Sequence, residues 1–264
     1  YVLMTVVGIL FLFPFFWMVI TSFKSMREVI ALPPIFIPSS LGIDSYARVF
    51  KEIRFARFFL NSLIVAVAVT AAVLLTSSMS GFAFAKYSFI GKAPLFIGVL
   101  STMMVPFEVV MIPLYLMMVK FNWANSYWGL IVPSVVSPFG IFLMRQFIES
   151  IPDDMIDAAR IDGCSEFRLY WQIVMPNVKP ALSALTIFTF MWQWNAFLWP
   201  FIIISSDRMR TLPLALAFYQ NMFTGPQYNV LMAATVLTIA PTVLVFLALQ
   251  KHFVRGIALT GMKA

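Results

Sequence analysis

Charged residues are scarce in this 264-residue chain, where Asp, Glu, Lys and Arg together make up only 11% of the residues. A soluble globular domain carries about 25%. Hydrophobic residues instead account for 61%, and the mean hydropathy is +0.91. This excess of apolar side chains is more than a protein core needs, so it predicts surfaces that face lipid.

Cysteine and histidine are nearly missing. Cys164 is the single cysteine, which excludes an intramolecular disulfide. The single histidine, His252, lies beyond the last apolar stretch, and Glu108 is the one acidic residue deep within such a stretch. A membrane enzyme needs a nucleophile–base pair, an aspartyl dyad or metal ligands. We therefore expect no catalytic site and no metal site.

A phosphate-binding loop of the form G-x-x-x-x-G-K-[ST] is also missing. The nearest approach ends at Gly91-Lys92, but Lys86 stands at the first glycine position and Ala93 at the last. A phosphate cradle needs the backbone amides and the hydroxyl of that motif. We expect no ATP or Mg to bind to this chain.

Six apolar stretches are long enough to cross a bilayer as helices, which takes about 20 residues each. They lie at residues 2–23, 58–85, 95–119, 126–147, 180–204 and 230–250. A β-barrel is excluded because its strands alternate polar and apolar residues, whereas these runs are continuous. The sequence predicts an all-α polytopic membrane protein with six transmembrane helices in residues 1–250, followed by a tail at 251–264.

The net charge of +7 does not indicate nucleic acid, because the basic residues are scattered through the connections between apolar stretches. Membrane anchoring explains them better. Lys and Arg divide nine against nine between the two sides of a six-span arrangement, so the positive-inside rule does not fix the orientation.

The longest polar connection, residues 149–179, has the pattern of two short helices around a glycine turn. Ser150 is placed to cap the first helix, Gly163 to end it in a left-handed conformation, and Ser165 to cap the second. One face of the first helix carries Met155, Ile156 and Ala159. From these residues alone, the connection is either an ordinary solvated loop or a rigid unit that a partner protein grips.

The residues of this connection resemble the EAA loop of ABC importer permeases, which has Glu-Ala-Ala, three residues, Gly, and then hydrophobic residues ending in Pro. The residues that match the motif or its immediate surroundings are Asp157, Ala158, Ala159, Asp162, Gly163, Cys164, Phe167 and Pro176. The chain departs from the pattern at Asp157, where Glu is usual, and at Cys164, where Ala is usual. The resemblance implies that these residues form coupling helices docked in a cleft of a cytoplasmic ATPase.

The resemblance covers nearly the whole chain and is closest to the second, six-span permease of maltose-type sugar importers. It rests also on Ser22-Phe-Lys24, Asn61-Ser62, Pro113-Leu-Tyr115, Trp194-Asn195 and the tail from Gln250 to Lys263. It implies a subunit of the bacterial inner membrane with a cytoplasmic coupling loop and tail. The implied partners are a second permease, an ATPase homodimer that binds ATP and Mg, an extracytoplasmic solute-binding protein, and a sugar. A glycerol-phosphate compound or an acidic oligosaccharide is the alternative substrate.

Polar residues inside the apolar stretches are candidates for the translocation path, because they are costly in lipid unless paired or facing a cavity. Glu108 lies between Pro106 and Pro113, and is either a path residue or a buried carboxyl bonded to backbone that the prolines free. Gln193, Trp194 and Asn195 combine an aromatic face with amides, which suits a sugar; helix packing with amide hydrogen bonds is the alternative. A channel or secondary transporter is a further rival, but no internal repeat or selectivity filter is visible.

Overall fold

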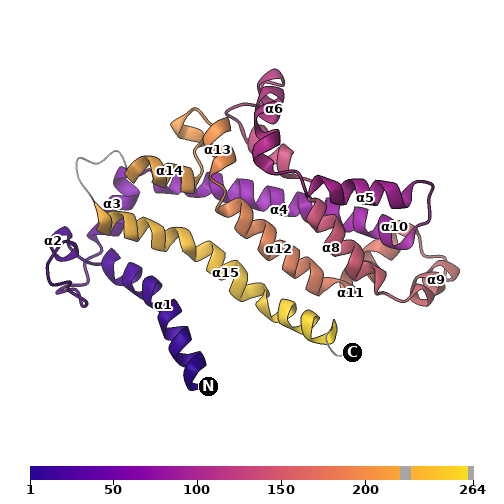
Figure 1. The fold of residues 1–264 in the computed structure, drawn as a ribbon, viewed down its shortest axis with the longest axis horizontal. Helices are drawn as coiled ribbons and strands as arrows, with labels where there is room; N and C mark the ends of the chain where they lie inside the picture. Colours follow the sequence, from indigo (N-terminus) through magenta and orange to yellow (C-terminus); the bar gives the residue numbers. More distant parts are fainter. Residues whose placement is uncertain (221–226, 261–264) are drawn as a thin grey trace. The chain divides into compact units, whose positions relative to one another are not determined.

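The computed structural model describes residues 1–220 and 227–260, with side chains up to Lys251 (Figure 1). Within these ranges all regular secondary structure is helical and there is no strand. The all-α architecture expected from the continuous apolar runs is thereby confirmed for the described residues. The chain divides into two compact units, Tyr1–Leu63 with Ser206–Leu244, and Ile64–Ser205 with Val245–Ala264.

The first unit contains the helices of both chain ends. They are α1 (Val2–Ser22), α2 (Met26–Val29), α3 (Asp44–Glu52), the start of α4 (Phe55–Lys86), η3 (Asp207–Met209), α14 (Leu212–Gln220) and most of the described part of α15 (Tyr228–Thr260). Buried amide and hydroxyl groups hold it together: Asn61 Nδ2 donates to the carbonyls of Arg208 (2.9 Å) and Arg210 (2.8 Å). A short helix, α3, follows the segment that contains Pro33, Pro34 and Pro38.

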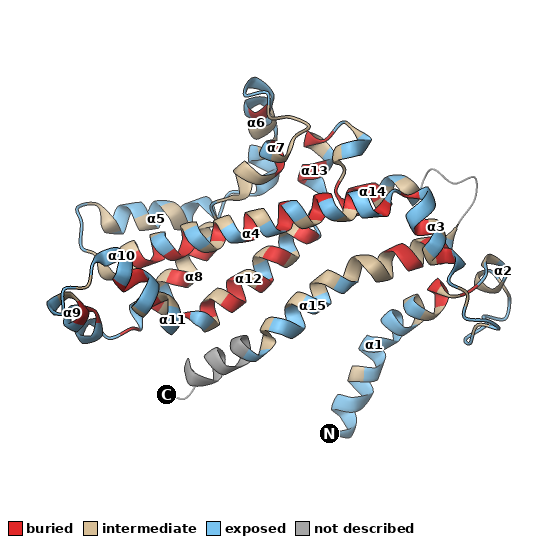
Figure 2. Ribbon diagram, turned by 180° about the vertical axis from the view of Figure 1, so that it is seen from behind, coloured by how far each residue is buried: buried red, intermediate tan, exposed pale blue. Residues whose placement is uncertain are grey.

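The second unit contains the middle of the chain, including the polar connection at residues 149–179 that was predicted to be a coupling loop. Its helices are the rest of α4, α5 (Lys92–Thr102), α6 (Phe107–Lys120), α7 (Tyr127–Ile131), η1 (Val132–Ser134), α8 (Pro138–Glu149), α9 (Asp153–Ile161), α10 (Glu166–Leu169), the π-helical turn η2 (Tyr170–Val174), α11 (Met175–Asn177), α12 (Lys179–Trp194) and α13 (Leu198–Ile203). Helix α8 lies against α5 and α12. Figure 2 shows the buried residues following α4 and α12, while much of α5 is exposed.

Small residues allow α4 and α8 to approach closely. A Cβ atom added to Gly140 would lie 2.3 Å from Ser77 Oγ, and one added to Gly81 would lie 2.7 Å from Met144 Cβ. Close backbone approach of this kind is how helices associate in lipid, where no hydrophobic force drives them together. The buried hydroxyls of Ser78 and Tyr170 add a 2.6 Å hydrogen bond between α4 and η2.

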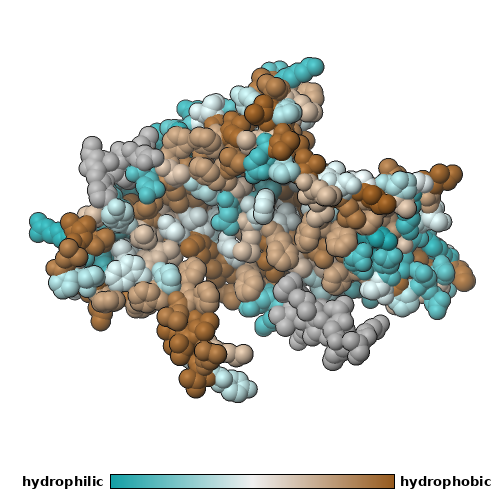
Figure 3. Space-filling view, in the orientation of Figure 1, coloured by the Kyte–Doolittle hydropathy of each residue, from teal (hydrophilic) through white to brown (hydrophobic). Residues whose placement is uncertain are grey.

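In the part of the chain that the structure describes, three helices are long and apolar enough to cross a membrane unaided: α1, α4 and Tyr228–Lys251 of α15. Three more pairs of helices qualify only if each bent pair is counted as one span, which makes up to six. Their surfaces are strongly apolar, and α1 forms a deep brown rod in the hydropathy view (Figure 3). The predicted multi-pass character is therefore supported, while three of the predicted continuous spans are broken.

The expected helix at 95–119 bends by 96° between α5 and α6. Pro106 is the N-cap of α6 and lacks an amide hydrogen, and a residue before proline is disfavoured in the α conformation, so both effects favour a break at this point. The expected helix at 126–147 bends by 42° before α8, whose first residue is Pro138.

The expected helix at 180–204 is also not continuous. Helix α12 ends at Trp194, and α13 begins only at Leu198. Before α12 the chain turns by 80° at Val178, between Pro176 and Pro180. At the other end of the chain, α15 continues to Thr260, so the predicted tail at 251–264 begins as an extension of the last helix; residues 261–264 lie outside the described residues.

Candidate coupling site and translocation path

The predicted glycine turn of the coupling loop (residues 149–179) is present. Gly163 has a φ of +78°, and the amides of Gly163 and Cys164 donate to the carbonyls of Arg160 and Ala159, both at 3.0 Å. These two bonds form a Schellman motif, which ends α9 and needs a residue in the left-handed conformation. Ser165 then caps α10 by accepting from the Arg168 amide at 3.3 Å. The chain therefore reverses sharply between two short, well-terminated helices.

The predicted cap at the start of the first helix is wrong. Ser150 ends α8 instead, where its hydroxyl donates to the Phe147 carbonyl at 2.8 Å. Helix α9 begins after Pro152, because the residue before a proline avoids the helical conformation. Asp153 and Asp154 occupy its first turn, where a negative charge is favoured by the helix dipole.

Burial divides α9 and α10 into a side that packs on the protein and a side that is free. Ile156 is 1% exposed and Ala159 8%, so these two residues form the inner side. Met155 was expected beside them but is 42% exposed. Asp157, Ala158, Asp162, Gly163 and Phe167 are exposed, and Cys164 is half-buried.

Two apolar side chains stand out on this free side. Phe167 is 72% exposed and Ile161 is 86% exposed. Ile161 was not among the residues predicted for this site. Ile161 follows Ile156 by five residues and so lies on another helix face, a spacing that was available in the sequence. Exposed apolar groups on a polar loop are typical of a protein-binding surface.

An ionic network fixes α9 relative to α10. Arg160 donates to Glu166 at 2.9 Å and to Asp157 at 3.3 Å. The hydroxyl of Tyr87, in the α4–α5 connection, donates to the other oxygen of Glu166. The hydrogen bond from Arg160, followed by that from Tyr87, lowers the pKa of Glu166. Burial and the neighbouring carboxylate raise the pKa of Tyr87 to about 12, so both groups keep the forms this network needs at neutral pH.

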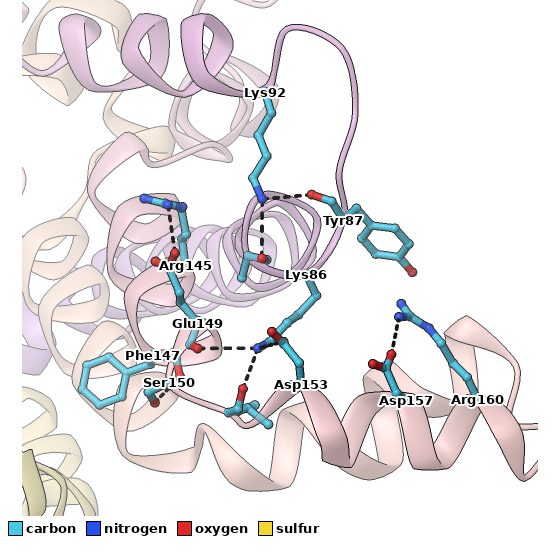
Figure 4. A network of polar contacts seen from close by, with 12 residues as sticks. Lys86, Tyr87, Lys92, Arg145, Phe147, Glu149, Ser150, Asp153, Asp157 and Arg160 are labelled. Atoms are coloured by element: carbon cyan, nitrogen blue, oxygen red, sulfur yellow. Dashed lines mark hydrogen bonds and ion pairs between the residues drawn. The ribbon is translucent and has the colours of Figure 1, made fainter.

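Lys86, the last residue of α4, holds the segment that leads into α9. Its ammonium group donates to Asp153 Oδ1 at 2.7 Å and to the carbonyls of Ile151 at 2.5 Å and Glu149 at 3.5 Å (Figure 4). The hydrogen bond and charge of Lys86 lower the pKa of Asp153. This role of Lys86 was not predicted from the sequence, where its position at the end of a long apolar stretch was the available signal.

The first translocation-path candidate, Glu108, lies exposed in the first turn of α6. The alternative of a carboxyl buried within this chain is therefore wrong. Its neighbour Phe107 packs edge-on against Trp199 of α13, with ring centroids 5.9 Å apart. This contact places the start of α6 beside the segment that follows α12.

The second group of candidates lies at the end of α12. Trp194 is 1% exposed and stacks on Phe190 at 5.7 Å, so its ring is part of the core. Asn195 caps α12 by donating to the Met191 carbonyl at 2.8 Å, and Gln193 is half-buried. Trp192 is 79% exposed and is the aromatic ring of this segment that faces outward.

Comparison with known proteins places this geometry in context. Residues 74–259 match the family described as "Binding-protein-dependent transport system inner membrane component". The arabinooligosaccharides transport system permease protein AraQ of Halalkalibacterium halodurans is 36% identical over 95% of this chain and 91% of its own length. The protein of the same name from Bacillus subtilis is 38% identical, over 97% and 92%.

Other relatives carry different substrate names. The sn-glycerol-3-phosphate transport system permease protein UgpE of Yersinia pestis is 32% identical over 97% of this chain and 94% of its own length. A solved structure, described as a bacterial ABC transporter involved in the import of the acidic polysaccharide alginate, shares the fold with a TM-score of 0.84, at 23% identity over 96% of this chain and 94% of that one. The chain belongs to the family of binding-protein-dependent transport system inner membrane components.

Proposed function

We propose that this chain is a permease subunit of an ATP-driven ABC importer and translocates a sugar or oligosaccharide across the bacterial inner membrane. The observation that carries the proposal is its identity of 36% and 38% to two arabinooligosaccharide permeases over at least 95% of the chain. The fold supports the same conclusion, since apolar helices alternate with polar connections, and the connection at residues 149–179 contains a sharp, well-capped turn.

In this proposal the six spans are α1, α4, α15, the bent pairs α5–α6 and α7–α8, and α12, while α10 to α11 belong to the cytoplasmic loop. The coupling loop and the end of α15 face the cytoplasm. The exposed side of α9 and α10, with Asp157, Ala158, Asp162, Gly163, Phe167 and the newly found Ile161, docks on a separate ATPase dimer. Ala159 and Cys164 shape the turn from inside: Ala159 is buried, and its carbonyl accepts the amide of Cys164. ATP and Mg are bound by that dimer, and none by this chain.

The remaining partners are a second permease subunit and an extracytoplasmic binding protein that delivers the substrate. Closure of the ATPase dimer pulls the coupling loop and switches the spans between inward-open and outward-open states. Glu108, Gln193 and Asn195 remain candidates for the substrate path, since each has polar atoms at a surface of the isolated chain. Trp194 supports the path from the core and does not face the substrate.

An oligosaccharide is the favoured substrate class, because the two relatives named for arabinooligosaccharides share more identity with the chain than the relative named for sn-glycerol-3-phosphate. Glycerol phosphate is the second candidate, supported by that 32% relative.

Transport by vesicles that hold the complete assembly tests the proposal. ATP supplied on the side of the vesicle membrane that carries the ATPase should drive transport of an arabino-oligosaccharide. The binding protein should stimulate ATP hydrolysis. Glycerol 3-phosphate in excess should leave this uptake unchanged; competition by it would favour the second candidate. Uptake that follows an ion gradient and needs no ATP would identify a secondary transporter and contradict the proposal.

A further inference from the structure

Lys86, the last residue of α4, has a buried side chain although a polar connection begins directly after it. Only 4% of its side chain is exposed, although its partner Asp153 is 81% exposed. A buried ammonium group is costly unless it is paired and its hydrogen bonds are made. The three acceptors of Asp153, Ile151 and Glu149 match the three donors of the ammonium group. This match ties the last residue of α4 to Glu149 and Ile151, which precede Pro152, and to the first turn of α9.

Tyr87 makes a second tie one residue further along. Its hydroxyl donates to Glu166 in the first turn of α10, and the Arg160 guanidinium lies 5.8 Å from the centre of its ring. The carbonyl of Tyr87 accepts from Lys92 at 2.9 Å, which holds the connection itself in place. Both short helices of the coupling loop are therefore fastened to the same end of α4, and Figure 4 shows the tie from Lys86 to the first turn of α9.

Neither residue belongs to the surface that is free for docking. Ile161 and Phe167 lie on α9 and α10, exposed, whereas Lys86 and Tyr87 contact those helices from the α4 side. A force applied to the exposed side of α9 and α10 would reach α4 by two routes. One route is through these hydrogen bonds, and the other is along the chain into α8, which packs closely against α4.

We propose that Lys86 and Tyr87 are positioning residues that brace α9 and α10 against the end of α4, so that the coupling loop and this 32-residue helix move as one body during transport. The inference rests on the proposed importer function. The brace transmits motion and contacts neither nucleotide nor substrate. Its loss should leave the ATPase docked and active while the membrane helices follow it poorly.

The test compares uptake per ATP hydrolysed in vesicles that contain the complete assembly. Lys86→Met keeps the length of the side chain and removes the charge and its donors. Because charge-assisted hydrogen bonds of this kind are lost, we expect the ratio to fall by roughly tenfold, with ATPase binding and basal hydrolysis retained. Lys120→Met is the matched control, since Lys120 is exposed at the end of α6, and its ratio should equal that of the unaltered chain.

A second pair of variants tests the brace independently, in case Lys86→Met fails to fold. Tyr87→Phe removes one oxygen atom, and Glu166→Gln removes the charge that this hydroxyl contacts. Each should lower uptake per ATP, and the double variant should lower it no further than the stronger single variant, because both act on the same Tyr87–Glu166 hydrogen bond. Lys86→Arg should restore part of the ratio.

An unchanged ratio in Lys86→Met, or fully additive losses in the Tyr87 and Glu166 pair, would overturn the brace while leaving the importer function intact. Absence of ATP-dependent uptake in the unaltered assembly is a separate result, which would overturn the proposed function and the brace together.

Discussion

At the scale of single residues, Gly163 decides how α9 ends. Its φ of +78° is unfavourable for a residue with a Cβ atom, and no atom lies within 4 Å of the position where that Cβ would be. Gly163→Ala should therefore lower the free energy of unfolding by about 1–2 kcal/mol through backbone strain alone. Gly163→Asn should cost less, because Asn tolerates the left-handed conformation. Thermal unfolding of the purified subunits measures both; an alanine variant as stable as the glycine parent would contradict the observed turn.

Trp194 and Trp192 provide a second contrast at this scale. Trp194 is buried against Phe190, so Trp194→Ala should lower the free energy of unfolding by about 3–5 kcal/mol. Trp192 is exposed, and Trp192→Ala should change the free energy of unfolding by no more than about 0.5 kcal/mol in the isolated subunit. Denaturant titration in detergent separates the two. Equal losses would show that the burial assigned to the Trp194 ring is wrong.

At the scale of helices, the contact between α4 and α8 depends on Gly140. Gly140→Ala would place its Cβ 2.3 Å from Ser77 Oγ and 3.0 Å from Ser77 Cβ, so we expect a loss of about 1–3 kcal/mol in the free energy of unfolding. In a Ser77→Gly background the same change should cost less, because both clashing atoms are gone.

Gly98→Ala is the control for this prediction, since nothing lies within 4 Å of the added atom. It should be neutral or slightly stabilising, as alanine favours the helix. Equal effects of the alanine change at 140 and at 98, measured by thermal unfolding, would contradict the close approach of the two helices.

The coupling loop was predictable from sequence because its signals are local. Gly163 and Ser165 act on the backbone within a few residues, and the structure has both where the pattern predicts them. The failed cap at Ser150 has a local cause too, since Pro152 sets the start of α9 and the prediction gave this effect too little weight. By contrast, the ties of Lys86 and Tyr87 join residues more than 60 positions apart in the chain, which no local pattern reveals.

The broken spans show, at the scale of helices, the same limit of prediction from local sequence patterns. Hydropathy identified apolar stretches correctly, but it averages over a window and does not register where a helix stops. Pro106, Pro138, Pro176 and Pro180 were visible in the sequence and lie at or near the bends. Proline inside a membrane helix often only kinks it, so the bend of 96° between α5 and α6 could not be read from the residue alone.

At the scale of the whole molecule, composition was sufficient for the membrane class, because so few charged residues cannot cover a soluble protein of this size, and the continuous apolar runs predicted the all-α fold. The candidate substrate path was not predictable to the same degree. Trp194 has an aromatic ring of the kind that binds sugars, but this ring lies in the core. Whether a side chain is buried depends on long-range contacts, which a local sequence pattern does not reveal. Glu108 was expected either on the path or buried; it is exposed in the isolated chain.

The central claim is that the exposed side of α9 and α10 contacts a cytoplasmic ATPase. A photo-cross-linking residue at position 161 or 167 of the intact assembly tests it most directly, with position 36 as the control, because Phe36 is also exposed but lies in the connection expected outside the cytoplasm. We predict adducts with the ATPase from 161 and 167 and none from 36. Adducts from 161 and 167 with the extracytoplasmic binding protein, or none with the ATPase, would contradict the account.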